Sequence, residues 1–133
     1  MEVKLIVDTS AYTAFKRNHQ RVVEALLQGD QVLISPIVLG ELYFGFRRGS
    51  HLQKNVAELS SFLECTPVQV IPINGITADR YSRVVLELKR QGTPIPTNDI
   101  WLAAQALEHG AELLTLDRHF EYVPGLVRTV FDG

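Results

Sequence analysis

Cysteine, long apolar runs and an excess of basic charge are all scarce in this chain. Its 133 residues include one cysteine, Cys65, which cannot form an internal disulfide and so indicates a reducing compartment. We interpret Cys65, which follows Phe62 and Leu63, as a small core residue. No stretch reaches the roughly 18 apolar residues of a membrane span, and the apolar run at the N-terminus is too short for a signal peptide. We therefore expect a cytoplasmic protein without a membrane-embedded part.

The net charge of −2 speaks against a strong nonspecific nucleic-acid binder, because such proteins usually carry a basic excess. It does not exclude an enzyme that acts on nucleic acid, since an acidic metal site lowers the local charge and a bound cation restores it. With 46% hydrophobic and 21% charged residues, the composition is that of an ordinary globular protein. We find no repeat, linker or low-complexity segment and expect one domain over residues 1–133.

Short apolar runs alternate with helical patterns along the chain. The apolar runs predict buried strands, and apolar residues at helical spacing predict amphipathic helices. Ser35 followed by Pro36 is typical of a helix start, and Gly110 of a helix end. We expect strands at 4–7, 32–34, 68–71, 112–116 and 127–130, and helices at 11–15, 21–28, 37–47, 51–63, 76–90 and 99–108. Such alternation is typical of an α/β fold with a mostly parallel sheet covered by helices on both faces.

Acidic residues occupy the positions where such a sheet places its chemistry. Asp8 and Asp117 each end an apolar strand, and sites in open α/β sheets form at the carboxyl ends of strands. Asp99 begins a predicted helix that Asn98 or Thr97 is expected to cap. Taken singly, these aspartates have ordinary explanations as helix caps, helix-dipole partners or turn residues. Glu41, in an apolar helix, could equally be a surface charge or an ion-pair partner.

The functional interpretation gains strength because these acids point to one place. Converging carboxylates raise one another's pKa values unless a cation joins them. Oxygen ligands without histidine or cysteine favour a hard cation, Mg²⁺ or Mn²⁺, and one or two ions fit the pattern equally. Such a site can polarise a phosphodiester and lower the pKa of water. The neighbouring polar residues that can orient the carboxylates or the water, or serve only as caps and strand residues, are Thr9, Ser10, Asn98 and Thr115.

Four segments, in this order, resemble the PIN domain and within it the VapC-type toxins. They span nearly the whole chain and read Val7-Asp8-Thr9-Ser10, Val38-Leu39-Gly40-Glu41-Leu42, Thr97-Asn98-Asp99-Ile100-Trp101-Leu102-Ala103-Ala104 and Thr115-Leu116-Asp117-Arg118-His119-Phe120. The resemblance implies a three-layer α/β/α fold and a Mg²⁺- or Mn²⁺-dependent endoribonuclease. It also implies a VapB-like antitoxin partner and a homodimer.

The resemblance further implies which residues carry the chemistry. The acids that match the family's metal-binding and water-activating positions are Asp8, Glu41, Asp99 and Asp117. Asp8, Asp99 and Asp117 are the metal ligands in this scheme, with Asp117 acting directly or through water, and Glu41 acts on the attacking water. Ser10, Asn98 and Thr115 match positions that are commonly polar in the family.

Basic, aromatic and histidine residues have weaker signals. Arg48 lies on nearly the same helix face as Glu41, and Arg118 follows Asp117, so either can meet RNA or an antitoxin, although a helix C-terminus alone explains Arg48. We interpret Trp101, Tyr43, Phe44 and Phe46 as core or interface residues, with the last three able to contact a partner, rather than as base-stacking platforms. The histidines show no metal-ligand spacing and are expected at the surface: His19, His51, His109 and His119.

Other function classes fit less well. A receiver-like phosphoacceptor domain needs a lysine after its last acidic strand, but the last lysine is Lys89. A haloacid-dehalogenase-like phosphatase needs a second aspartate where Ser10 stands, and a dinucleotide-binding domain needs a glycine-rich turn after the first strand. A catalytically inactive PIN-like scaffold remains the non-enzymatic alternative, against which four retained acids argue.

Overall fold

A five-stranded parallel sheet forms the centre of the molecule in the computed structural model, which describes residues 1–133. The strands are β1 (Lys4–Val7), β2 (Gln31–Ile34), β3 (Val68–Val70), β4 (Glu112–Thr115) and β5 (Arg128–Val130). The helices are α1 (Thr9–Lys16), α2 (Gln20–Leu27), α3 (Pro36–Arg48), α4 (Leu52–Glu64), α5 (Gly75–Gln91) and α6 (Thr97–His109), followed by a 3₁₀ turn, η1 (Arg118–Tyr122). The predicted order of elements and the α/β/α class are confirmed.

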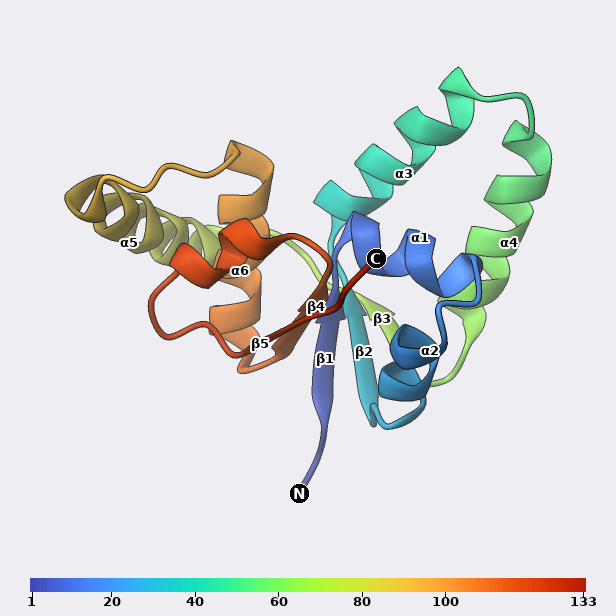
Figure 1. Cartoon of the computed structure of the whole chain (residues 1–133), viewed down its shortest axis with the longest axis horizontal. Helices are drawn as coiled ribbons and strands as arrows, with labels where there is room; N and C mark the ends of the chain where they lie inside the picture. The colour runs from blue at the N-terminus through green and yellow to red at the C-terminus, as the bar shows by residue number, and fades with distance from the viewer.

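The strand order is β3-β2-β1-β4-β5. The first strand, β1, is therefore central, with β2 and β3 on one side of it and β4 and β5 on the other. Figure 1 shows α1 and α2 on one side of the sheet and α5 and α6 on the other. Helix α3 rises from the carboxyl end of β2, and α4 runs back toward the sheet. The change of direction lies between β1 and β4, and open α/β sheets bind ligands outside the carboxyl ends of the strands at such a point.

The core is built from the apolar runs that predicted the strands. In β1, Leu5, Ile6 and Val7 are at most 3% exposed, because helices cover both faces of this central strand. They belong to a cluster of 29 buried apolar residues that also takes in one face of most helices. Cys65 is exposed, so the expectation that it is a core residue is wrong. It follows the end of α4, whose buried residue is Leu59.

Helix ends follow the predicted chemistry with one exception. Ser35 caps α3 through its hydroxyl oxygen, and Gly110 ends α6 with a φ of 62°, a left-handed conformation that suits glycine. Neither Thr97 nor Asn98 caps α6, contrary to expectation. Pro96 takes that position, and its carbonyl accepts the backbone N–H groups of Asp99 and Ile100. None of the helices combines the length and apolar character that crossing a membrane requires.

The buried centre of β1 predicts a measurable stability cost. Replacing Ile6, whose side chain is fully buried, with alanine leaves a cavity in the middle of the sheet. We expect Ile6→Ala to lower the free energy of unfolding by about 2–5 kcal/mol and Ile6→Val by about 0.5–1.5 kcal/mol, measured by urea denaturation. Val3→Ala, at a residue that is 38% exposed, is the control. Equal losses for Ile6→Ala and Val3→Ala would contradict this packing.

Candidate active site

A pocket of about 540 Å³ opens at the carboxyl end of the sheet where the strand order changes direction. It draws on β1, α1, α3, α6 and the segment after β4, so residues far apart in the sequence meet there. Its lining residues are Asp8, Thr9, Ser10, Glu41, Phe44, Pro96, Asp99, Asp117 and His119. The structure therefore brings all four predicted acids to one pocket.

Asp8 is the most buried of the acids, with 4% of its surface exposed. It ends β1 and caps α1: the backbone N–H of Ala11 and the hydroxyl of Ser10 both donate to its Oδ1 at 2.7 Å. The hydroxyl of Thr115, at the end of β4, donates to Oδ2. The capping explanation for Asp8 therefore holds and accounts for Oδ1, while Oδ2 is held by a residue from the neighbouring strand.

Burial raises the pKa of Asp8 above its ordinary value, even though three hydrogen bonds to the carboxylate oppose that shift. The negative charge of Asp117 adds to the rise. A carboxylate in this position keeps its charge more easily when a cation lies next to it. Its surroundings thus favour a positively charged ligand at the pocket.

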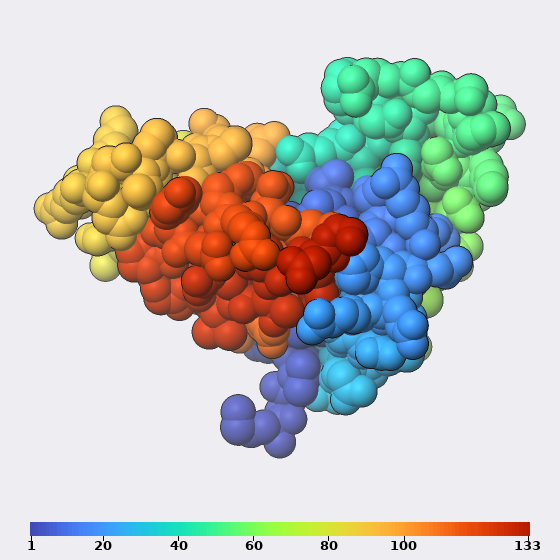
Figure 2. Space-filling view, viewed as in Figure 1, coloured from blue at the N-terminus to red at the C-terminus, as the bar shows by residue number.

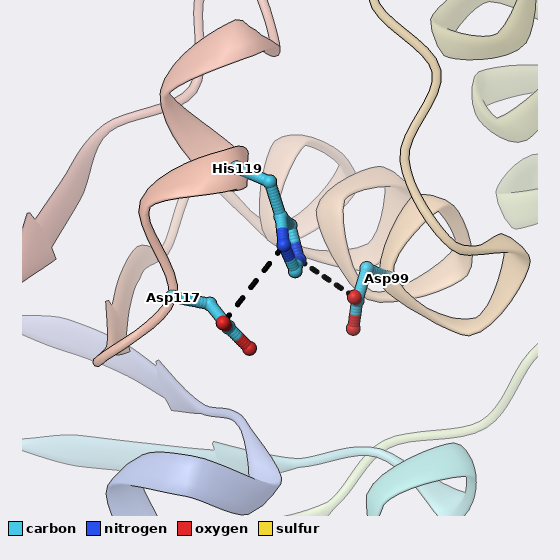
Figure 3. A group of neighbouring side chains, drawn as sticks. All are labelled: Asp99, Asp117 and His119. Atoms are coloured by element: carbon cyan, nitrogen blue, oxygen red, sulfur yellow. Dashed lines mark hydrogen bonds and ion pairs between the residues drawn. The ribbon is translucent and has the colours of Figure 1, made fainter.

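Asp99 and Asp117 face each other across His119, as Figure 3 shows. The Nε2 of His119 lies 2.7 Å from Oδ2 of Asp99, and its Nδ1 lies 3.9 Å from Oδ1 of Asp117. Asp99 belongs to the first turn of α6, while Asp117 and His119 come from the segment that follows β4 and enters η1. One ring thus lies between carboxylates from two separate parts of the chain.

Burial also raises the pKa of Asp99, and the like charges of Glu41 and Asp117 push it the same way. The charge and hydrogen bond of His119 act in the opposite direction but do not cancel the effect of burial. Two of the four acids are therefore held where ionisation is costly without a positive partner.

Glu41 reaches the pocket from α3 and is held by side chains of two other helices. The hydroxyl of Thr9, in α1, donates to its Oε1, and the amide of Asn98, in α6, donates to its Oε2 at 3.2 Å. These bonds answer the question that the sequence leaves open for Glu41: it is neither a free surface charge nor part of a salt bridge. Both oxygens are oriented by neutral donors.

The polar neighbours of the acids mostly lie where the sequence suggests. Ser10 bonds to Asp8 and also accepts the backbone N–H of Leu116, which ties α1 to the end of β4. Thr115 is fully buried, bonds to Asp8 and accepts the backbone N–H of Asp117. Asn98 bonds to Glu41, not to an aspartate. Each of these side chains orients a carboxylate or the backbone that carries one.

The two arginine candidates lie outside the pocket lining. Arg118 pairs with Asp132 at 3.1 Å and approaches Glu121 at 3.9 Å, so its charge is directed to acids of the C-terminal segment. The guanidinium of Arg48 lies over the ring of Phe44, which does line the pocket. The side chain of Arg48 therefore contacts a pocket residue, whereas that of Arg118 is directed to Asp132 and Glu121.

The surface expectation for His119 is wrong. Its side chain is only 27% exposed because the 3₁₀ turn at η1 folds it back against Asp99. The signal in the sequence is the spacing of Asp117 and His119, with one residue between them, directly after a buried strand. Of the four histidines only His51 is exposed.

The donor set suits a hard divalent cation. One ligand atom each from Asp99, Asp117 and His119 lies within 4.8 Å of the others, close enough to surround a single ion. Asp8 lines the same pocket with a carboxylate whose pKa is raised by burial. Carboxylate oxygens are the preferred ligands of Mg²⁺ and Mn²⁺.

A family model described as the PIN domain matches residues 5–126. The chain belongs to the PIN domain family. It is 34% identical over 125 residues to a protein of Rickettsia felis named ribonuclease VapC1, and the match covers 92% of each chain. The predicted family and the predicted fold are therefore both confirmed.

Solved structures of VapBC complexes support the same fold. A VapBC2 complex from Rickettsia felis bound to a DNA fragment from its promoter matches with a TM-score of 0.83 and 25% identity, covering 96% of this chain and 98% of that one. A DNA-bound VapBC complex from Salmonella typhimurium matches with a TM-score of 0.83 and 26% identity, covering 96% and 97%.

The buried charge of Asp8 predicts an unusual effect of mutation on stability. Its pKa is raised in the folded state, so at neutral pH the ionised side chain lowers the free energy of unfolding of the metal-free protein. That cost disappears as the pH falls through the raised pKa, because the folded protein takes up the proton first. We expect Asp8→Asn to raise the melting temperature at pH 7 in EDTA, with a gain that shrinks toward acid pH.

Calorimetry of the wild-type protein and of Asp8→Asn, from pH 7 toward acid pH, measures this difference in melting temperature. Asp79→Asn is the matched control, because Asp79 has a side chain that is 63% exposed and pairs only with Arg83 on the same helix. A lower melting temperature for Asp8→Asn than for the wild-type protein at pH 7 would show that Asp8 is not under electrostatic strain.

Proposed function

We propose that this protein is a metal-dependent endoribonuclease and the toxin of a VapBC-type toxin–antitoxin pair. The convergence of Asp8, Glu41, Asp99 and Asp117 on one pocket at the sheet's switch point carries the proposal. The PIN domain relatives named ribonuclease VapC supply the class of substrate. Membership in this family also speaks against a receiver-like phosphoacceptor domain.

Asp8, Asp99 and Asp117 are the residues we assign to the cation, Mg²⁺ or Mn²⁺. When bound, the cation stabilises the negative charge that develops on the phosphate. Asp8 contributes a carboxylate held in place by Ser10 and Thr115, and Asp99 one held by His119. His119 is added to the predicted set as the group that orients Asp99, with a ring nitrogen close enough to share in the site.

Glu41 is the residue we assign to the attacking water. Thr9 and Asn98 fix its two oxygens, so the carboxylate presents a defined direction to the pocket. Water attacks phosphorus, one of its protons passes to Glu41, and the bond from phosphorus to the 3′ oxygen breaks. The leaving oxygen takes up a proton from solvent water, which yields a 3′-hydroxyl and a 5′-phosphate, and Glu41 releases its proton to solvent. A positioned general base of this kind contributes about 100- to 10,000-fold to a rate.

A VapB-like antitoxin is the protein partner we assign to this chain, because the structural neighbours include VapBC complexes. We also propose that residues 1–133 act as one domain and that the toxin forms a homodimer. Arg48 and Arg118 are candidates for contact with RNA or with the antitoxin. Arg48 is the better placed of the two for RNA, since it adjoins the pocket while Arg118 is paired with Asp132.

Loss of a single acid tests the proposal. We expect Asp99→Asn to reduce Mg²⁺-supported cleavage of single-stranded RNA by at least about 100-fold, because even residues that only support metal ligands cost 10- to 100-fold when removed. Gel analysis of end-labelled RNA, with and without EDTA, measures the loss. Asp79→Asn, at an exposed site on α5, is expected to retain full activity.

Two outcomes would contradict the proposal. Cleavage by Asp99→Asn at the wild-type rate would remove Asp99 from the site. Failure of the wild-type protein to cleave any RNA in the presence of Mg²⁺ or Mn²⁺ would favour the inactive PIN-like scaffold.

A further inference from the structure

Phe44 is an exposed aromatic side chain at the edge of the acidic pocket. It is 61% exposed, although it lies on the same helix as the buried Val38 and Leu42. It lines the pocket of the four acids and also the adjoining hollow formed with Pro36, Ile37, Gly40, Glu41 and Asn98. Of the two places that the sequence predicts for Phe44, core or interface, its exposure excludes the core.

The neighbouring aromatic residues of α3 behave differently. Tyr43 and Phe46 are partly buried against the hydrophobic core and meet each other edge to face, with ring centroids 6.4 Å apart. Trp101 of α6 is stacked on Tyr81 at 4.0 Å and does not line the pocket of acids. Phe44 alone among these aromatic residues presents its ring at the pocket of acids.

Phe44 and Arg48 follow Glu41 on nearly the same face of α3. Three residues of helix correspond to about 4.5 Å and seven to about 10 Å along the axis, and both spacings keep side chains on nearly the same face. The guanidinium of Arg48 lies 4.9 Å from the centre of the Phe44 ring, a cation–π contact that holds the ring in place. In Figure 2, the surface is notched between α3 and the segment that leads into α6.

The net charge of the protein does not favour RNA binding. The chain has a net charge of −2, and four carboxylates line the pocket that the phosphate must enter. Stacking of a base on an aromatic ring is independent of that charge and tolerates any sequence, because every base has a π-face. Phe44 is an exposed aromatic ring beside the acids and has the chemistry that this contact needs.

We propose that Phe44 is a stacking platform for a nucleobase of the RNA strand, next to the phosphate that is cleaved, with Arg48 beside it to meet the backbone. This inference rests on the proposed function and adds the residue that positions the strand. Because α3 also carries Glu41, a base stacked on Phe44 aligns the strand with the residue assigned to the water. The ring contacts the substrate but takes no part in proton transfer.

Paired changes in protein and RNA test the contact. The probe is a synthetic 12-nucleotide single-stranded RNA that the wild-type protein cleaves, made again with an abasic nucleotide at each position around the cut. Removing one stacked base costs about 1–3 kcal/mol, so we expect one abasic position to lower kcat/KM of the wild-type enzyme by roughly 5- to 150-fold. Phe44→Ala is expected to lower kcat/KM for intact RNA by the same factor and to show no further loss at that abasic position.

Matched variants separate stacking from other roles. Phe44→Trp is expected to restore kcat/KM, whereas Phe44→Leu, which is apolar but not aromatic, is not. Tyr122→Ala removes an aromatic residue that is 50% exposed and outside the pocket, and is expected to act as wild type. Circular dichroism and Mn²⁺ binding are expected to stay unchanged in all of them.

Distinct results would overturn the inference and the proposed function. Normal kcat/KM for Phe44→Ala, or additive losses for Phe44→Ala and every abasic position, would overturn the stacking role alone. A change of oligomeric mass in Phe44→Ala that Phe44→Leu restores would also overturn it, by showing a contact between protein chains. Absence of metal-supported RNA cleavage by the wild-type protein would contradict the proposed function itself.

Discussion

The buried charge of Asp8 is the constraint around which the rest of the site is arranged. A carboxylate at the end of the central strand loses most of its hydration, and its pKa rises as a result. The protein compensates with three donors from two elements: the backbone N–H of Ala11 and the hydroxyl of Ser10 in the first turn of α1, and the hydroxyl of Thr115 on the adjacent strand. These bonds hold the carboxylate in place without neutralising it, which supports the cation that we propose for this pocket.

The strand order explains how Asp8 comes to lie next to the other acids. Because β1 and β4 are neighbours in the sheet but distant in the sequence, Asp8 and Asp117 are delivered to one edge by two independent strands. Helices α3 and α6 then add Glu41 and Asp99, and Thr9 and Asn98 bond to Glu41 from both sides. The acids are therefore positioned by the parallel sheet first and by hydrogen bonds between helices second.

The features that the sequence could predict are those set by local pattern. Apolar runs located the strands, and strand ends located Asp8 and Asp117, because parallel strands place their carboxyl ends at one edge. Asp99 was located by its place at a helix start together with the family resemblance, whereas Glu41 depended mainly on the resemblance, since a glutamate in an apolar helix has several ordinary explanations. The structure brings all four to one pocket.

What escaped prediction depends on tertiary geometry. The contact of His119 with Asp99 requires the 3₁₀ turn after β4, and the periodicity of the sequence does not predict that turn. The exposure of Phe44 and Cys65 depends on how α3 and α4 are oriented on the sheet. An apolar stretch of sequence alone does not reveal that orientation. The start of α6 at Pro96 likewise replaced an expected side-chain cap with a backbone carbonyl.

Calorimetric titration of the metal-free protein with Mn²⁺ tests the central claim most directly, because it measures binding of the proposed cation without depending on any RNA. The account predicts saturable binding to the wild-type protein and to Asp79→Asn, and loss of that binding in Asp8→Asn and in Asp99→Asn. Equal Mn²⁺ affinity in all four proteins would show that the acids at the switch point do not form a metal site.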